Sequence, residues 1–330
     1  MLIPLLTMIL SCSWMYKQKS LLASLHNGPY GVTSGLDGNL WFIEFHKIGK
    51  ISLSSGKITT YNLNNVNTHP GGIITGPDGN LWFTEQNLNK VGKMSPTTGK
   101  ITEYSIPGAT SDIGITFDPN DNLWFTEENP NKIGKLSPAT GEITEYSVPT
   151  ADAGLGSIAS GPDGNLWFTE TNANKIGKIS PTTGDVTEYS IVYPVNSRPC
   201  SITTGSDNNL WFTEFNGDKI DEISTITDDI TEYAIPTTNA GPIDIVSGPD
   251  GNLWFTESWG NKISKISPMT GGITEYDVPY PEFTGIHGLY YGPGVIITGP
   301  DGNLWFTDNN GSLNIISPTT GEITKYPFHD

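Results

Sequence analysis

Cysteine, basic residues and long apolar runs are all scarce in this sequence of 330 residues. Its 2 cysteines, Cys12 and Cys200, are too few for a disulfide framework or for a zinc site built on thiolates. Its 17 lysines and arginines stand against 35 acidic residues, which gives a formal net charge of −18. Because such an acidic surface repels phosphate backbones, we expect no nucleic-acid partner.

The most apolar run, MLIPLLTMIL at residues 1–10, is too short to cross a bilayer, which takes about 20 residues. We therefore expect no integral membrane segment. The run ends near the small residues Ser11 and Cys12, as the core of a signal peptide does, but no basic residue precedes it. A misassigned start, with Met15 as one alternative, is the other interpretation. Residues 1–26 are accordingly a candidate leader segment, and an exported and a cytoplasmic location both stay open.

The motif LWF recurs seven times and is the strongest pattern in the sequence. Its tryptophans lie 41 to 44 residues apart, except for an interval of 51 before the last. They are Trp41, Trp82, Trp124, Trp167, Trp211, Trp254 and Trp305. A tyrosine that closes an ITEY-like segment recurs with them. A period in the low forties is typical of the four-stranded blade of a β-propeller.

Each repeat predicts four short strands joined by tight turns. In the second copy the expected strands are 71–75, 81–85, 90–95 and 100–107. The Asp-Gly pair between the first two favours a two-residue hairpin, because both turn positions need a positive φ. No stretch shows a sustained 3.6-residue apolar period, and the chain has 38 glycines and 24 prolines. We therefore expect essentially no helix.

These patterns predict an all-β fold in which residues 27–330 form a single seven-bladed β-propeller of four-stranded blades. The repeated Trp and Phe side chains are expected to pack between blades, since no blade can bury both of its faces alone. The seventh copy is complete through GEITKY, so its outer strand comes from the C-terminal end and closure by an N-terminal strand is unnecessary. Packing between the faces of blades one and seven would then close the ring, and we expect a monomer.

An acidic residue follows each LWF motif, and under sevenfold pseudosymmetry these carboxylates could form a ring that binds Mg²⁺ or Ca²⁺. They are Glu44, Glu85, Glu127, Glu170, Glu214, Glu257 and Asp308. In five copies a lysine stands across the next hairpin, so a local ion pair is the favoured interpretation. These lysines are Lys90, Lys132, Lys175, Lys219 and Lys262. Asp308 has no such lysine, and we expect it to be the most available to a ligand.

Histidine is also rare, and His287 stands out among the 5 in the chain because it lies in the segment TGIHGLYYGPG. This segment belongs to an insertion of eight residues that lengthens the last interval. Extra length in one blade is where repeat proteins often carry function. With Glu282 before it and Asp308 after it, His287 is the best candidate for a general base. A loop histidine without a role is the alternative, and the insert is also compatible with a lid or a ligand platform.

The segments GPYGVT, GPDGNLWFTE, NKIGKIS and GEITEY closely resemble the blades of the streptogramin B lyases, the virginiamycin B lyase family, over about residues 27–326. The resemblance implies a seven-bladed propeller that confers antibiotic resistance by opening the lactone of a cyclic depsipeptide through elimination. In that chemistry Mg²⁺ polarises the ester while a histidine removes the neighbouring proton.

The resemblance also implies site residues. Alignment on the LWF tryptophans places the family's two P-H-[AG]-I histidines at Ile243 and Gly294. If the eight residues after the His287 segment are treated as inserted, His287 matches the catalytic histidine of blade seven instead. Glu282 and Asp308 then match the two metal-binding carboxylates, and the ligand would be a small cyclic peptide or another lactone.

Two other functions stay open at this stage. One is a non-catalytic propeller that binds a peptide, a glycan or a protein at the mouth of its channel. The other is a Ca²⁺-dependent lactonase of the gluconolactonase type, against which the seven repeats count, because those propellers usually have six blades.

Overall fold

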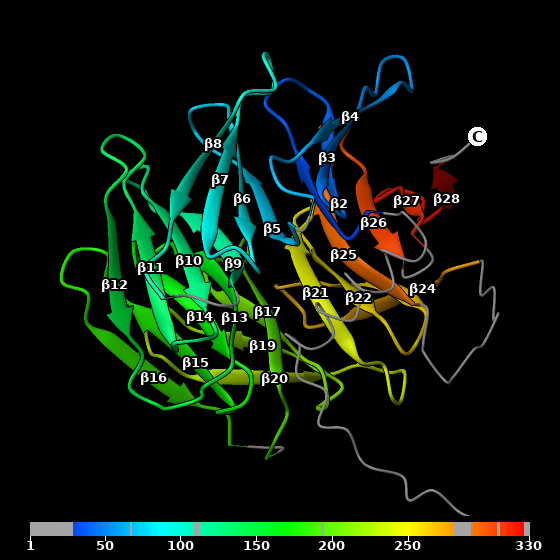
Figure 1. Cartoon of the computed structure of the whole chain (residues 1–330). Coiled ribbons are helices and arrows are strands. Elements are labelled where there is room, and N and C mark those ends of the chain that lie inside the picture. Colours follow the sequence, from blue (N-terminus) through cyan, green and yellow to red (C-terminus); the bar gives the residue numbers. More distant parts are fainter. Residues whose placement is uncertain are drawn as a thin grey trace, which may run out of the picture.

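The computed structural model describes residues 29–66, 68–108, 112–192, 195–279, 292–308 and 311–326. These residues form 28 strands in seven antiparallel four-stranded sheets, and no helix occurs among them (Figure 1). Each sheet consists of four consecutive strands, which is the blade predicted from the repeat. The prediction of an all-β, seven-bladed propeller is therefore confirmed. The candidate leader, residues 1–26, lies outside the described residues.

The strands of each blade run outward from the axis in chain order. Blades one to three are β1 (Gly31–Ser34), β2 (Leu40–Glu44), β3 (Lys47–Ile51) and β4 (Ile58–Asn62); β5 (Pro70–Thr75), β6 (Leu81–Glu85), β7 (Lys90–Met94) and β8 (Ile101–Ser105); and β9 (Asp112–Phe117), β10 (Leu123–Glu127), β11 (Lys132–Leu136) and β12 (Ile143–Ser147). Blades four and five are β13 (Leu155–Ser160), β14 (Leu166–Glu170), β15 (Lys175–Ile179) and β16 (Val186–Ser190); and β17 (Pro199–Thr204), β18 (Leu210–Glu214), β19 (Lys219–Ile223) and β20 (Ile230–Ala234). Blades six and seven are β21 (Pro242–Ser247), β22 (Leu253–Glu257), β23 (Lys262–Ile266) and β24 (Ile273–Asp277); and β25 (Pro293–Thr298), β26 (Leu304–Asp308), β27 (Leu313–Ile316) and β28 (Ile323–Tyr326).

The first strand of each blade contacts the first strand of the next, and β25 contacts β1, so the ring closes around the axis. Blade seven ends in β28, near the C-terminus, as predicted. Side chains join blades one and seven: Trp305 and Leu313 share a buried cluster with Val32. The hydroxyl of Ser34 also donates to the carbonyl of Thr298 at 2.6 Å. Packing and a few hydrogen bonds therefore close the propeller.

The LWF side chains form the core between blades, as predicted. All seven tryptophans are buried, none of them more than 1% exposed. Trp124, for example, shares a cluster with Leu166 and Phe168 of the next blade. Its Nε1 donates to the carboxylate of Asp118 at 2.8 Å, in the turn that precedes the strand. The repeated turn aspartate thus satisfies the one polar atom of a buried tryptophan.

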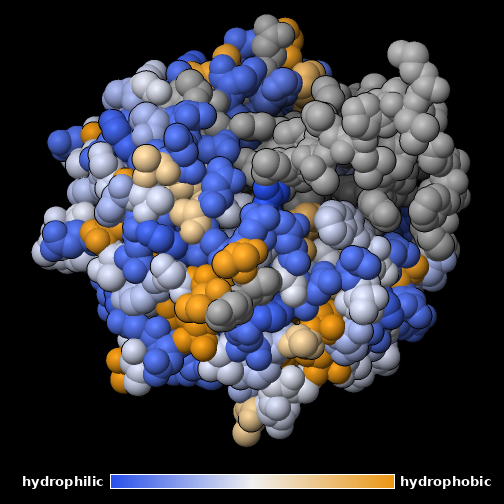
Figure 2. All heavy atoms as spheres, turned by 90° about the horizontal axis from the view of Figure 1, so that it is seen from below, coloured by the Kyte–Doolittle hydropathy of each residue, from blue (hydrophilic) through white to orange (hydrophobic). Residues whose placement is uncertain are grey.

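The outer surface is mostly hydrophilic. Figure 2 shows one face of the molecule, on which hydrophobic residues form small separate patches. The exposed large hydrophobic side chains of the described residues are scattered over turns and blade connections; they are Leu36, Val66, Val192, Val195, Ile226 and Met269. Among the described residues, no helix is long and apolar enough to cross a membrane.

Candidate functional site

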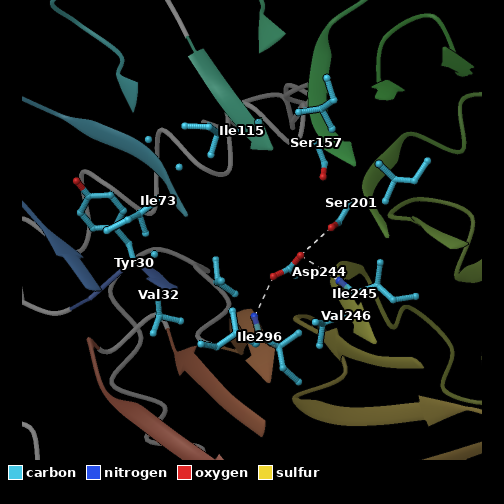
Figure 3. A pocket seen from close by; sticks show the side chains of 18 residues that line it. Tyr30, Val32, Ile73, Ile115, Ser157, Ser201, Asp244, Ile245, Val246 and Ile296 are labelled. Carbon is cyan, nitrogen blue, oxygen red and sulfur yellow. Dashed lines mark hydrogen bonds between the residues drawn. The ribbon is translucent and has the colours of Figure 1, made fainter. Parts of the chain in front are cut away.

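The seven innermost strands enclose a cavity of about 250 Å³ along the propeller axis (Figure 3). At one equivalent position, each blade contributes a β-branched aliphatic residue to its wall. They are Val32, Ile73, Ile115, Ile158, Ile202, Ile245 and Ile296. The channel is therefore apolar at this level, and polar groups reach it only from neighbouring positions.

In blades two to seven, a β-bulge near the start of the innermost strand sets which side chains face the channel. In β21, Pro242 pairs with Glu257 and Ile245 pairs with Phe255, so the two residues between them are displaced from the ladder. The threonine of LWFTE supports this bulge. Thr256 Oγ1 accepts a hydrogen bond from the amide of Asp244 at 3.1 Å and donates to the carbonyl of Gly294 on the next blade at 2.9 Å.

The equivalent threonine makes the same two hydrogen bonds in three more blades. Thr126, Thr169 and Thr213 each accept from an amide of their own first strand and donate to a carbonyl of the next blade. The repeated threonine therefore links adjacent first strands and fixes the shape of the channel wall.

At the position just before the aliphatic ring, three blades carry glycine, two carry serine, one carries aspartate and one carries valine. These residues are Gly31, Gly72, Gly114, Ser157, Ser201, Asp244 and Val295. Asp244 is the charged one among the residues that line the cavity. Its Oδ1 accepts from Ser201 Oγ at 2.7 Å and from the amide of Ile245 at 3.0 Å, and its Oδ2 accepts from the amide of Ile296 at 2.9 Å (Figure 3).

The acidic residues after LWF do not form a cation-binding ring in the described part of the chain. Five of them are at most 1% exposed, namely Glu85, Glu127, Glu170, Glu214 and Glu257, and none lines the cavity. Within the described ranges no group of three His, Cys, Asp or Glu side chains is placed to hold a metal ion. The interpretation of these positions as a metal ring is wrong for those residues.

The lysines across the hairpin also have a different partner from the one expected. Lys132 stands opposite Glu127 in the strand register, but its Nζ lies 2.8 Å from Glu145 on the outermost strand. Lys175 likewise pairs with Glu188 at 2.7 Å. Because a lysine keeps its ammonium group near water, it contacts the outer glutamate and not the fully buried one. The expected local ion pair is thus corrected to a pair between the third and fourth strands.

Burial dominates the electrostatics of these glutamates. It raises the pKa of Glu170 to about 8 and the pKa values of Glu85 and Glu257 to about 7. In blade six the hydroxyl of Ser264, on the third strand, donates to Glu257 at 2.5 Å. These carboxyls consequently hold a proton at higher pH than ordinary ones do.

Blade five departs from this pattern, and no sequence argument anticipated it. Where blades two to four carry glycine, it carries Asp221, which is fully buried on the same face of the sheet as Glu214. Burial raises the pKa of both carboxyls, and repulsion from Glu214 raises that of Asp221 further. The pair therefore retains a proton in the interior.

Only one of the three predicted site residues lies in the described part. Asp308 is half-buried, more accessible than the five buried glutamates. Its two carboxylate oxygens accept hydrogen bonds from the amide of Ser312 at 2.9 Å and from Asn314 Nδ2 at 3.2 Å. Its role as a metal ligand stays a prediction. His287 and Glu282 lie outside the described residues and stay predictions.

Ile243 and Gly294, which align with the family histidines, both lie in the described part of the chain. Ile243 is 1% exposed and packs in an apolar cluster with Cys200 and Phe215. Gly294 offers its carbonyl to Thr256. Two described histidines, His46 and His69, lie instead against the ring of Phe45, between blades one and two.

Comparison with known proteins places the chain in a family. The family model described as virginiamycin B lyase family matches residues 16–294 and 182–330. A catalytically inactive His-to-Ala variant of virginiamycin B lyase from Staphylococcus aureus, crystallised with quinupristin, is 38% identical with a TM-score of 0.78, over 87% of this chain and 93% of that one. A streptogramin B lyase structure is 38% identical with a TM-score of 0.76, over 86% and 91% of the two chains.

A more distant structure shares the fold alone. Hydrazine synthase from Kuenenia stuttgartiensis is 14% identical with a TM-score of 0.68, over 90% of this chain and 95% of that one. The comparison with curated proteins gives no match. Since the family model spans nearly the whole chain and the lyase structures are 38% identical over most of both lengths, this protein belongs to the virginiamycin B lyase family.

Proposed function

We propose that this protein opens the lactone of a small cyclic depsipeptide by elimination. The observation that supports the proposal best is the likeness, over 87% of the chain, to a lyase crystallised with quinupristin. Fold alone does not define an activity, so the proposal also depends on the residues at the mouth of the channel.

The candidate base is His287. Its imidazole would remove a proton from the carbon adjacent to the one that bears the ester oxygen. The electron pair of that C–H bond forms a carbon–carbon double bond, the ester C–O bond breaks, and the oxygen leaves as a carboxylate. No water is added, so the linear product has the same mass as the cyclic substrate.

The topology is compatible with this assignment. The segment that contains His287 connects β24 to β25 and enters the propeller at Pro293. Pro293 is the strand partner of Asp308. The segment therefore joins the propeller at the end of the blade where Asp308 lies.

The described residues alone do not make a Mg²⁺ site at Asp308, because no group of three His, Cys, Asp or Glu side chains lies together among them and the second expected ligand, Glu282, lies outside the described residues. No step of the proposed reaction is therefore assigned to a metal. The role of Mg²⁺, with Glu282 and Asp308 as ligands, stays a proposal that chelation tests.

A second function, ligand binding without turnover, is favoured by one specific observation. The two positions that align with the family histidines hold Ile243 and Gly294, neither of which can move a proton. A propeller of this kind would bind a peptide, a glycan or a protein at the channel mouth.

One assay separates the two functions. Purified protein is incubated with a type B streptogramin, with Mg²⁺ or with EDTA, and the products are read by mass spectrometry. We expect a linear product of unchanged mass. A product heavier by one water would identify a hydrolase instead, and no product would leave the binding function. Loss of product in EDTA would support the metal; equal product would exclude it.

A further inference from the structure

The single arginine of the chain, Arg198, directly precedes Pro199, the first residue of β17. It therefore lies at the end of the ring where the first strands begin. Its side chain is only 5% exposed. The side-chain nitrogen Nε donates to Asn196 Oδ1 at 3.4 Å, which is a long contact with a neutral acceptor. The guanidinium is thus a buried positive group without an acidic partner among the described residues.

The lysines of the described part behave differently. Every ion pair there uses a lysine, and each of these lysines lies within 3.3 Å of an Asp or Glu oxygen. Arg198 takes part in none of them, although the planar fork of an arginine fits a carboxylate best. Burying a charge costs free energy unless the charge is paired. The unpaired guanidinium therefore indicates a site for an anionic group.

The fold does not require an arginine at this position. The same loop recurs in blades four, five and six, where the carbonyls of Gly154, Arg198 and Gly241 each accept a hydrogen bond at 3.0–3.1 Å from the amide that follows the second strand. Their φ angles are 70°, 59° and 57°. A residue with a Cβ is disfavoured in this left-handed region, and the two neighbouring blades use glycine. The side chain of Arg198 is therefore an addition to a loop that forms without it.

Contacts with blade four fix the backbone that carries Arg198. The amide of Arg198 donates to Asn174 Oδ1 at 3.2 Å, and the hydroxyl of Ser197 donates to the same oxygen at 2.7 Å. The hydroxyl of Thr171 donates to the carbonyl of Pro199 at 2.8 Å. Because the backbone is already ordered between two blades, a ligand that binds the guanidinium has little ordering to impose on it.

The two terminal nitrogens are the part of Arg198 that a ligand can reach. Neither donates a hydrogen bond within the described part of the chain, and neither belongs to the unpaired polar atoms that are sealed from the surface. Burial lowers the pKa of the guanidinium. An arginine nevertheless keeps its charge at neutral pH, so both nitrogens offer charged donors.

The charges nearby define the class of ligand. Lys175 and Lys219 begin the third strands after the two loops that contact the Arg198 segment, and they are already paired with Glu188 and Glu232. One guanidinium then neutralises one negative charge, and the net charge of −18 disfavours anions with several charges. A carboxylate has a single charge and two oxygens that match the two terminal nitrogens.

We propose that Arg198 binds the carboxylate group of a small organic monoanion through the two terminal nitrogens of its guanidinium. The proposal is based on the described residues of blades four to six. It makes no use of the proposed elimination or of His287.

The test is a ¹⁹F NMR titration with 4-fluorobenzoate at pH 7. We expect wild-type protein to bind it with a dissociation constant of about 1–10 mM, as is reasonable for so small a ligand. Arg198→Gly copies the residue of blades four and six, so it should fold, and it should bind at least about tenfold more weakly. Lys100→Gln removes one positive charge from an exposed turn and is the matched control, which should bind like the wild type. Thermal unfolding checks that both variants fold.

A second comparison uses wild-type protein alone, so it holds even if the Gly variant fails to fold. 4-Fluorobenzamide has the same ring and nearly the same shape without the charge, and it should bind at least about tenfold more weakly than 4-fluorobenzoate. Equal binding of the two ligands, equal binding by wild type and a folded Arg198→Gly, or no binding of 4-fluorobenzoate would each overturn the proposal.

Discussion

The second strand and the first strand of each blade follow different rules. The second strands read LWFTE in five consecutive blades, whereas the first strands read PGGIIT, DIGITF, LGSIAS, PCSITT, PIDIVS and PGVIIT in blades two to seven. The Leu, Trp, Phe and Thr of LWFTE contact a neighbouring blade, and those contacts recur around the ring. The position just before the aliphatic ring, occupied for example by Gly72, Ser201 and Asp244, is not part of this repeated contact, and its residue varies among blades. The repeated strand thus carries the fold, and the varied strand gives each part of the channel wall its own chemistry.

Truncating a repeated residue should have the largest effect on stability. Trp124→Ala should lower the free energy of unfolding by about 3–5 kcal/mol, because a large buried side chain is replaced by a cavity. The indole also loses its hydrogen bond to Asp118 and its contact with Leu166 of the next blade. Urea denaturation measures the change.

Met269→Ala is the control for that variant, since Met269 is 92% exposed. It should alter stability by less than about 0.5 kcal/mol. A Trp124→Ala protein as stable as this control would show that the repeated tryptophans do not hold the blades together.

The buried glutamates predict an effect of pH on stability. Burial raises the pKa of Glu170 to about 8, so between its ordinary value and about 8 the folded state binds more protons than the unfolded state does. Stability contributed by this group is fully present at pH 4.5 and is lost as the pH rises to about 8. Between these pH values the wild type should therefore lose on the order of 2–4 kcal/mol of its free energy of unfolding through this group. Glu170→Gln should lack this loss.

Thermal unfolding at pH 5 and pH 8 is the measurement. The matched control is Glu142→Gln, in an exposed turn, which should keep the wild-type pH dependence. If Glu170→Gln keeps it as well, the buried carboxyl of the repeat does not hold its proton in the folded state.

Blade five allows a smaller change that sharpens the comparison. Asp221→Ser copies the arrangement of blade six, where Ser264 donates a hydrogen bond to Glu257. Removing one of two buried carboxyls should raise stability at pH 8 by about 1–3 kcal/mol, and by less at pH 5. Asp221→Ser that is no more stable than wild type at pH 8 would contradict the account of this pair.

The sequence was sufficient to predict the fold, because the demands of blade packing recur with the period of the repeat. It identified the tryptophans as interblade contacts and the C-terminal strand as the outer strand of blade seven. It did not identify the partner of Lys132, since Glu127 and Glu145 are both its neighbours across strands and only burial decides between them.

Asp244 was missed for a different reason. The alignment on tryptophans stopped at Ile243, one residue earlier, and the bulge in β21 breaks the alternation that would show which side chain faces the channel. The sequence analysis equally missed the pairing of Asp221 with Glu214, because the glycine of this third-strand position is replaced by a different residue in each of blades five, six and seven: Asp221, Ser264 and Asn314.

The most direct test of the lyase proposal is the streptogramin assay repeated with His287→Ala. We predict that the variant forms no linear product while its thermal unfolding matches that of the wild type. A variant that forms the linear product at the wild-type rate would contradict the assignment of His287 as the base, and with it the account of where this propeller carries its chemistry.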